Sequence, residues 1–322
     1  MAFRILQRTS TAAGATSTSR SADPPDLDIA GVRDAYERRV HHICPEHLPA
    51  AMQLLERLPP KRWTLEWYLP WWLGYALRLE HAVARDVVLS NVLGLASIRL
   101  QDDLADGEVP PDEVADAQIL AAGLYEAALE PYAARFDAAS PFWEHLERRM
   151  TAWREAGSGL DLAARGAPLH IAAIATSLYA DRMDVYRVLE PCLDQALEAL
   201  VRYDHVADWE ADLDAGRWNA FVAAASPGPQ VAEARDRHRI ATYVAMLTSE
   251  VIATWFAGID DELQQAASIA DTLRPAMPPL PAHLRTFAVG VSEHGAAIHL
   301  RYRDIGDEAA KLLLQTPADA RS

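Results

Sequence analysis

Apolar residues recur every three to four positions along most of this chain, and clusters of glycine and proline separate the segments that have this spacing. Good helix formers dominate these segments, whereas the strict alternation of apolar and polar residues that is typical of a half-buried strand is scarce. The glycine and proline clusters mark the loops between helices. The pattern predicts helices over residues 32–40, 46–58, 65–80, 82–104, 112–136, 141–156, 169–189, 192–214, 231–258, 260–273 and 282–314.

The predicted fold is all-α, with one domain over residues 28–322. No strand is followed by a glycine-rich loop and a helix, so a nucleotide-binding α/β domain is not expected. No repeat of fixed period stands out, which argues against a solenoid. Since no segment after residue 28 has the composition of an interdomain linker, we expect the helices to form one bundle around a central apolar cavity.

The N-terminal segment, residues 1–27, is rich in Ser, Thr and Ala and has no apolar periodicity. We predict that it is a disordered tail. Arg4, Arg8 and Arg20 precede the first acidic residue, Asp23, so an organellar transit peptide is the alternative. The segment lacks the apolar stretch of a signal peptide, and secretion is therefore not expected.

The most apolar predicted helix leads into the first of two acidic clusters. Residues 87–100 are almost continuously apolar, which places this helix in the interior. Asp102, Asp103 and Asp106 follow at spacings that share a helix face, where like charges repel and the helix dipole disfavours anions. A divalent cation, which prefers several carboxylate oxygens, would explain this cluster. A frayed, acidic helix end is the plain alternative.

A second acidic cluster follows another mostly apolar helix. Asp204, Asp208 and Asp212 are each four residues apart, so on a helix they form a column that turns by about 40° per step. A solvated charged face usually alternates acidic and basic residues, but no Lys or Arg lies between Tyr203 and Gly216. We interpret the two clusters as facing walls of one site, in which divalent metal ions hold a diphosphate. A charged outer face without a role is the alternative.

The whole chain is acidic, with 46 Asp and Glu against 30 Lys and Arg and a formal net charge of −16. This balance argues against nucleic acid as a partner, because such binding needs a basic surface. The two cysteines, Cys44 and Cys192, do not make a disulfide framework, which indicates a reducing, cytoplasmic location. No apolar run approaches the roughly 20 residues that span a bilayer, so stable membrane insertion is not expected.

Together, the two clusters resemble the metal-binding motifs of class I isoprenoid synthases. Residues 102–106, DDLAD, match the DDxxD motif of that superfamily. Asp204, Asp208 and Asp212 match the spacing of the second motif of class I terpene cyclases, (N/D)DxxSxxxE. Here Asp stands in the Ser and Glu places, and His205 stands where the second residue is usually Asp. The resemblance implies the all-α class I isoprenoid synthase fold around an apolar cavity.

The second cluster also looks like the DxxxDxxxGR motif of squalene and phytoene synthases, which share this fold and join two prenyl diphosphates head to head. Residues 208–217 supply its defined positions, with Arg217 as the last. The first motif of those enzymes is usually DxxED, and Ala105 stands here in place of the Glu. Elongating prenyl diphosphate synthases also carry two Asp-rich motifs, but residues 107–111 lack the basic side chains that usually follow their first motif.

Two further features resemble bacterial terpene cyclases. Arg301 and Tyr302 lie on the last long predicted helix, where those enzymes often carry an Arg-Tyr pair that contacts diphosphate as the site closes. Arg165 lies 39 residues before Asp204, which is close to the usual place of the family's diphosphate-sensing Arg. The Gly-Ala-Pro run that follows Arg165 would supply the helix break expected there.

The resemblance implies a class I terpene cyclase, a lyase that ionises a linear C15 or C20 prenyl diphosphate and cyclises it to a terpene hydrocarbon or alcohol. It implies three Mg²⁺ ions as cofactors. The catalytic residues it assigns are Asp102, Asp103, Asp106, Asp204, Asp208 and Asp212. All of these except Asp103 are the assigned metal ligands, and Arg165, Arg217, Arg301 and Tyr302 are assigned to the substrate diphosphate.

Two other functions stay open. A prenyl-coupling enzyme of the same fold would join two prenyl diphosphates, either head to head or by chain elongation. A non-catalytic helical protein would use the same acidic residues to bind a metal or a partner. The sequence leaves the substrate chain length, the product and the oligomeric state open, although a homodimer is common in this fold.

Overall fold

The computed structural model describes residues 24–156 and 161–315, and all regular structure in these ranges is helical. The all-α prediction is therefore confirmed. The α-helices are α1 (Ile29–Ile43), α2 (Leu48–Glu56), α3 (Thr64–Ala76), α4 (His81–Ala105), α5 (Val114–Ala133), α6 (Pro141–Glu155), α7 (Leu169–Tyr179), α8 (Met183–Asp214), α9 (Ala220–Ala225), α10 (Arg235–Thr248), α11 (Val251–Ala270) and α12 (Pro279–Gln315). A short 3₁₀ helix, η5 (Ala163–Gly166), precedes α7.

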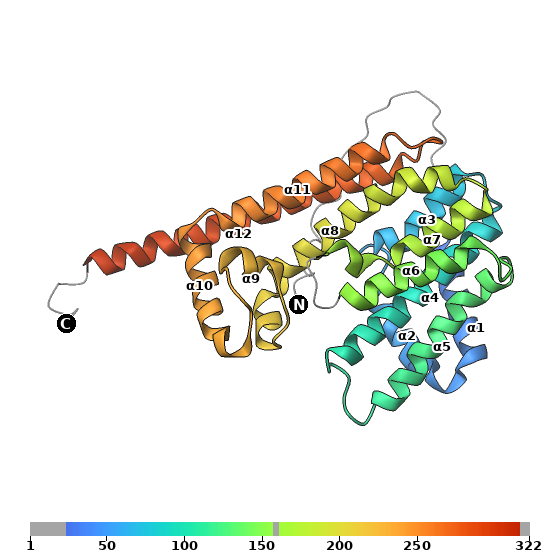
Figure 1. Cartoon of the computed structure of the whole chain (residues 1–322), viewed down its shortest axis with the longest axis horizontal. Coiled ribbons are helices and arrows are strands. Elements are labelled where there is room, and N and C mark those ends of the chain that lie inside the picture. Colours follow the sequence, from blue (N-terminus) through green and yellow to red (C-terminus); the bar gives the residue numbers. More distant parts are fainter. Residues whose placement is uncertain (1–23, 157–160, 316–322) are drawn as a thin grey trace.

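The helices enclose two apolar cores that meet at α3. The N-terminal core is built mainly by α1, α2, α4 and α5, and the C-terminal core mainly by α6 to α12 (Figure 1). Helix α3 contributes Trp67 and Trp71 to the N-terminal core and Leu65, Leu69 and Leu73 to the C-terminal core. A helix that is apolar on most faces is buried on most sides, so α3 joins the two halves of the molecule.

Three long helices, α8, α11 and α12, run side by side through the C-terminal core (Figure 1). Helix α8 has 32 residues, which at 1.5 Å per residue is a length of about 48 Å. Its first half packs on α7, while α9 and α10 pack near its last turns (Figure 1). The two ends of α8 therefore lie in different surroundings, and the second acidic cluster lies at the end near α9.

The predicted helix break at residues 189–192 is wrong. Helix α8 runs unbroken through Pro191, and the chain breaks instead at Asp181, which has a φ of 52°. Leu189 and Cys192 are fully buried on either side of the exposed Pro191. The burial of these neighbours stabilises the helix by more than the lost hydrogen bond at Pro191 destabilises it. Proline alone was therefore a misleading signal of a helix end.

The predicted helix end at Gly258 is also wrong. Helix α11 continues through Gly258, and the break between α10 and α11 lies at Ser249, whose backbone is extended. A Cβ at position 258 would lie 2.8 Å from a guanidinium nitrogen of Arg202 on α8. The glycine therefore makes room for an arginine of the neighbouring helix and does not end its own.

The packed chain begins before the predicted domain boundary at residue 28. Leu27 is buried in the N-terminal core, and the carbonyl oxygen of Pro25 accepts a 2.7 Å hydrogen bond from Nε1 of Trp71. The predicted tail falls mostly on residues 1–23, which lie outside the described residues.

Within the described ranges, no single helix is both long and apolar enough to cross a membrane. Helices α10 and α11 meet the length and composition criteria only as a pair, and this pair is bent by 84°.

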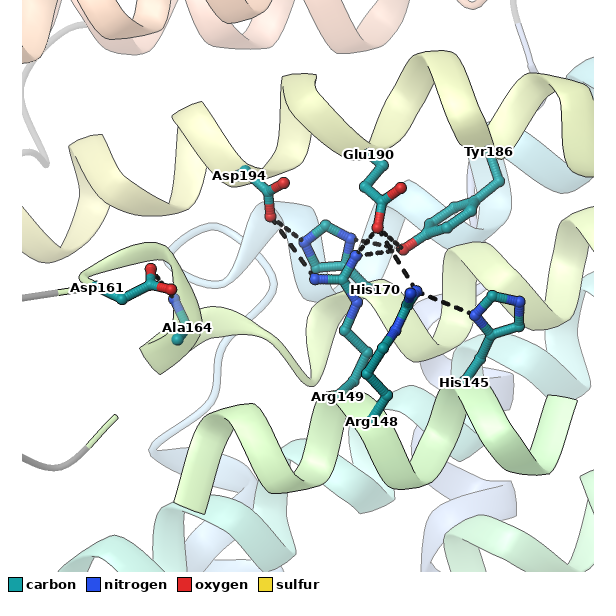
Figure 2. Close-up of polar contacts among 9 residues, drawn as sticks. All are labelled: His145, Arg148, Arg149, Asp161, Ala164, His170, Tyr186, Glu190 and Asp194. Carbon is teal, nitrogen blue, oxygen red and sulfur yellow. Dashed lines mark hydrogen bonds and ion pairs between the residues drawn. The ribbon is translucent and has the colours of Figure 1, made fainter. Parts of the chain in front are cut away.

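A polar network fixes α8 against α6 and α7 (Figure 2). His170 of α7 is fully buried, with Nδ1 3.1 Å from the hydroxyl of Tyr186 and Nε2 3.1 Å from a carboxylate oxygen of Asp194. Arg149 of α6 donates to the Tyr186 hydroxyl at 2.7 Å and pairs with Glu190. Tyr186, Glu190 and Asp194 are each four residues apart and share one face of α8. The network therefore sets the rotation of α8 about its own axis.

Replacement of Gly295 by Ala should destabilise the protein by about 1–3 kcal/mol, because a Cβ there would overlap the ring of Phe256 where α11 packs on α12. Gly94→Ala is the matched control. Its Cβ would meet the nearest atom, on Ala128, at 3.8 Å, and Ala is favoured over Gly within a helix by about 1 kcal/mol. Urea unfolding measured by circular dichroism tests both. A Gly295 variant as stable as the Gly94 variant would contradict the packing of α11 on α12.

Candidate functional site

Both acidic clusters lie at helix C-termini that have the same type of cap, a glycine in the left-handed region. At the end of α4, Gly107 has a φ of 70°, and the N–H of Glu108 donates to the carbonyl oxygen of Asp103 at 2.9 Å. At the end of α8, Gly216 has a φ of 72°, and the next N–H, that of residue 217, donates to the carbonyl oxygen five residues back at 2.8 Å. Glycine suits this left-handed position, so α4 ends at Ala105, directly before Asp106, and α8 ends at Asp214, two residues after Asp212.

Arg217 joins the two clusters. Its Nη1 lies 2.8 Å from Oδ2 of Asp106 at the end of α4, and its Nε lies 3.0 Å from Oδ1 of Asp212 on α8. The structure therefore brings the two acidic helix ends together, as the sequence predicted. The glycine turn at Gly216 directs Arg217 back over the last turn of α8, where it meets both carboxylates.

Asn219 holds Asp212 in place. Its Nδ2 donates to Oδ2 of Asp212 at 2.8 Å and to the carbonyl oxygen of His205 at 2.9 Å. Its Oδ1 caps α9 by accepting from the N–H of Phe221 at 2.9 Å. Asn219 is fully buried, so these bonds are not exchanged with water. Sequence reasoning missed Asn219, although an Asn directly before a short apolar helix is a recognisable N-cap signal.

Three of the aspartates, Asp102, Asp204 and Asp208, hold their protons more tightly than a free carboxylate. Burial raises the pKa of Asp102 to about 6, and burial together with the neighbouring Asp208 raises that of Asp204 to about 6. Burial also raises the pKa of Asp208. Asp204 is nonetheless accessible to solvent. The ionised form of these carboxylates is therefore disfavoured unless a positive charge lies close to them.

Three arginines that the sequence did not single out surround the clusters. Nη1 of Arg57 bonds Oδ2 of the buried Asp103 at 2.9 Å, so this aspartate faces α2 and not the other carboxylates. Arg99 lies 3.9 Å from Asp102 and 3.8 Å from Asp103. Burial and Arg99 lower the pKa of Arg62, while Asp204 and Asp208 raise it, which places Arg62 beside the second cluster.

Arg165 lies on a short 3₁₀ helix that packs against α8. It belongs to η5, directly before the break that precedes α7, and its Nη1 is 3.1 Å from Nε2 of His205. Its charge also opposes the rise in the pKa of Asp102 that burial causes. Arg165 therefore lies between the first cluster on α4 and the second on α8.

The structure does not bring Arg301 and Tyr302 to the aspartates. Arg301 is exposed on α12, and Tyr302 lies near Glu210, whose charge contributes to raising the Tyr302 pKa after burial. Glu210 is two residues from Asp208, which on a helix is a rotation of about 200°. Tyr302 therefore lies on the side of α8 opposite the aspartate column. That this pair moves to the site when ligand binds stays a prediction.

The donor set fits a hard divalent cation that shares its coordination with a ligand. In the described part of the chain, no three His, Cys, Asp or Glu side chains are grouped closely enough to hold a metal by themselves. Mg²⁺ usually keeps several waters and takes only one or two carboxylates together with substrate phosphates. The separated carboxylate oxygens on α4 and α8 suit that mode of binding and not a cage of protein ligands alone.

Two hollows formed by the described residues lie away from the aspartates. One, of about 480 Å³, is lined by residues that include Arg202 and Trp255, and the other, of about 370 Å³, by residues that include Phe136 and Trp143. The central apolar cavity expected from the sequence therefore stays a prediction.

Comparisons of this chain with protein-family models, with curated proteins and with solved structures found no match. The resemblance to class I isoprenoid synthases therefore rests on the two motifs and on the geometry described above.

Asp204→Asn should stabilise the protein above pH 6 and have little effect near pH 4. The folded pKa of about 6 exceeds the ordinary value of 3.8, so the ionised carboxylate destabilises the fold at neutral pH, and this penalty shrinks as pH falls below 6 and is lost near 3.8. Solvent screening limits the gain to about 1 kcal/mol, or about 2 °C in melting temperature. Thermal melts from pH 4 to pH 8 measure it, with the exposed Asp34→Asn as control. A difference in melting temperature between Asp204→Asn and wild type that stays the same from pH 4 to pH 8 would contradict this prediction.

Proposed function

We propose that this protein is a Mg²⁺-dependent enzyme that ionises a linear prenyl diphosphate and releases diphosphate, with cyclisation of one C15 or C20 substrate as the first candidate reaction. The observation that carries the proposal is the approach of two aspartate-rich helix ends, with Arg217 in contact with both. Carboxylates on two neighbouring helix ends, with arginines among them, are arranged to bind metal ions and a polyphosphate together.

The side chains have separate tasks in this proposal. The residues that would hold Mg²⁺ are Asp102, Asp106, Asp204, Asp208 and Asp212. When bound, Mg²⁺ would stabilise the charge that develops on the departing diphosphate. Arg165 and Arg217 would donate to the diphosphate oxygens, and Asn219 would keep Asp212 oriented through the hydrogen bond it already makes. Asp103 would act indirectly, by holding Arg57 and Arg99 beside the other aspartates.

A prenyl-coupling enzyme of the same fold is the second candidate, and the position of Arg217 favours it. Arg217 ends the stretch that looks like the squalene and phytoene synthase motif, and it lies between the clusters. The Arg301–Tyr302 pair, which resembles a feature of cyclases, lies on the other side of α8. In both candidates the substrate ionises to an allylic cation. In a cyclase this cation reacts with a double bond of the same molecule, whereas in a coupling enzyme it reacts with a second prenyl diphosphate.

Asp102→Asn and Asp208→Asn should each lower the rate of diphosphate release by about 100-fold, because each would remove charge that binds metal at the reacting centre. A coupled diphosphate-release assay with Mg²⁺ and C10, C15 and C20 prenyl diphosphates measures the rate. Asp214→Asn is the matched control, since Asp214 lies on α8 but is exposed and pairs with Arg239. We expect its rate within about twofold of wild type. Full activity in both site variants would refute the metal site.

Gas chromatography of the products separates the two candidate reactions. Given Mg²⁺ and a single C15 or C20 prenyl diphosphate, a cyclase forms a cyclic hydrocarbon or alcohol that contains one substrate skeleton. A product whose carbon number is the sum of two prenyl groups would instead identify a coupling enzyme. If wild type released no diphosphate from any of these substrates, alone or in pairs, the non-catalytic alternative would be favoured.

A further inference from the structure

His205, the residue after Asp204, is buried and held by three contacts. It is only 2% exposed. Its Nε2 lies 3.1 Å from Nη1 of Arg165, and its Nδ1 lies 3.2 Å from the backbone N of Ala220 at the start of α9. The ring of Trp218 packs edge-on against it at a centroid distance of 5.9 Å. The imidazole therefore cannot rotate without giving up one of these partners.

Both ring nitrogens of His205 face a hydrogen-bond donor. The guanidinium of Arg165 and the backbone N–H of Ala220 can donate but cannot accept. A neutral imidazole offers one acceptor nitrogen, and a protonated imidazole offers none. Whichever tautomer is present, only one of the two contacts can be a hydrogen bond, and the other places two donors against each other. The contact between His205 and Arg165 is therefore poorly satisfied.

Arg165 is also short of partners elsewhere. Its Nε is buried and has no hydrogen-bond partner among the described residues. No carboxylate in the described ranges lies within ion-pair distance of it, whereas Arg217 contacts both Asp106 and Asp212. Arg165 is thus a cation near the two acidic clusters. It is held by His205, and at least one of its N–H groups has no hydrogen-bond partner among the described residues.

We propose that His205 is a positioning residue: it keeps Arg165 directed between the two acidic clusters without neutralising it, so that an incoming diphosphate meets a guanidinium with no carboxylate partner. This inference rests on the function proposed above, since it takes diphosphate as the ligand. When diphosphate oxygens take the N–H groups of Arg165, His205 keeps only Ala220 as a partner, and the conflict between donors ends. A carboxylate at position 205 would instead bind Arg165 in a buried, charge-assisted pair that the ligand would have to break.

A double-mutant cycle tests this role without requiring turnover. Isothermal titration calorimetry measures the binding of inorganic diphosphate, in the presence of Mg²⁺, to wild type, His205→Glu, Arg165→Gln and the double variant. We expect His205→Glu to weaken binding by about 10- to 100-fold in the wild-type background. In the Arg165→Gln background the same change should weaken binding by no more than about twofold. His205→Gln, the neutral control, should bind within about threefold of wild type.

An equal loss in both backgrounds would mean that the new carboxylate repels the anion directly, and it would overturn the positioning role. So would a His205→Gln variant that loses as much affinity as His205→Glu together with a lower melting temperature, because that pattern indicates a structural role. If wild type itself fails to bind diphosphate with Mg²⁺, the proposed function is contradicted. Binding by wild type without coupling in the cycle contradicts only the role of His205.

A second measurement needs no variant. Nitrogen-15 NMR of the imidazole reports which ring nitrogen of His205 carries the proton. We expect a mixture of tautomers without ligand, because two donors compete for one acceptor. With Mg²⁺ and diphosphate we expect a single tautomer protonated on Nε2, which leaves Nδ1 to accept from Ala220. A spectrum that does not change when diphosphate binds would overturn the proposal.

Discussion

Repulsion between carboxylates is the constraint that the structure around the ends of α4 and α8 must satisfy. Both helices end in aspartates, although the helix dipole disfavours anions there, and the two ends face each other. Arg217 allows this approach by contacting Asp106 on one side and Asp212 on the other. Asp103 is withdrawn from the group by burial against Arg57. The repulsion between the remaining aspartates therefore depends on the positions of these arginines.

The direction in which the second acidic cluster points is fixed far from the cluster itself. Eighteen residues make five turns of an α-helix, so Tyr186 and Asp204 lie at the same angle on α8 and about 27 Å apart. Tyr186 is held against α7 by His170 and against α6 by Arg149 (Figure 2). Because a helix is rigid, contacts that fix its rotation near one terminus also fix the direction of side chains on the same face near the other terminus. The polar network among α6, α7 and α8 therefore orients the aspartates toward α4.

The sequence was informative where a local pattern was sufficient and misleading where packing decided. Helical periodicity predicted an all-α chain, and the spacing of the acidic residues predicted two clusters that the structure brings together. The break at Asp181 was missed because buried neighbours carry α8 through Pro191. The roles of Arg57 and Asn219 were missed because each depends on a partner far along the chain or on another element. No periodicity or spacing encodes such a contact.

The arrangement of charges also discriminates between the ligands that the acidic clusters could take. Five arginines lie among the aspartates, namely Arg57, Arg62, Arg99, Arg165 and Arg217. A metal ion alone would compete with Arg217 for Asp106 and Asp212 and would give Arg165 no partner, and an anion alone would leave the carboxylates unneutralised. A diphosphate with Mg²⁺ supplies both kinds of partner, so that aspartates meet metal and arginines meet phosphate oxygens. The presence of both charge signs at the ends of α4 and α8 therefore favours the proposed metal–diphosphate ligand over a metal-only site, even though the chain has a net charge of −16.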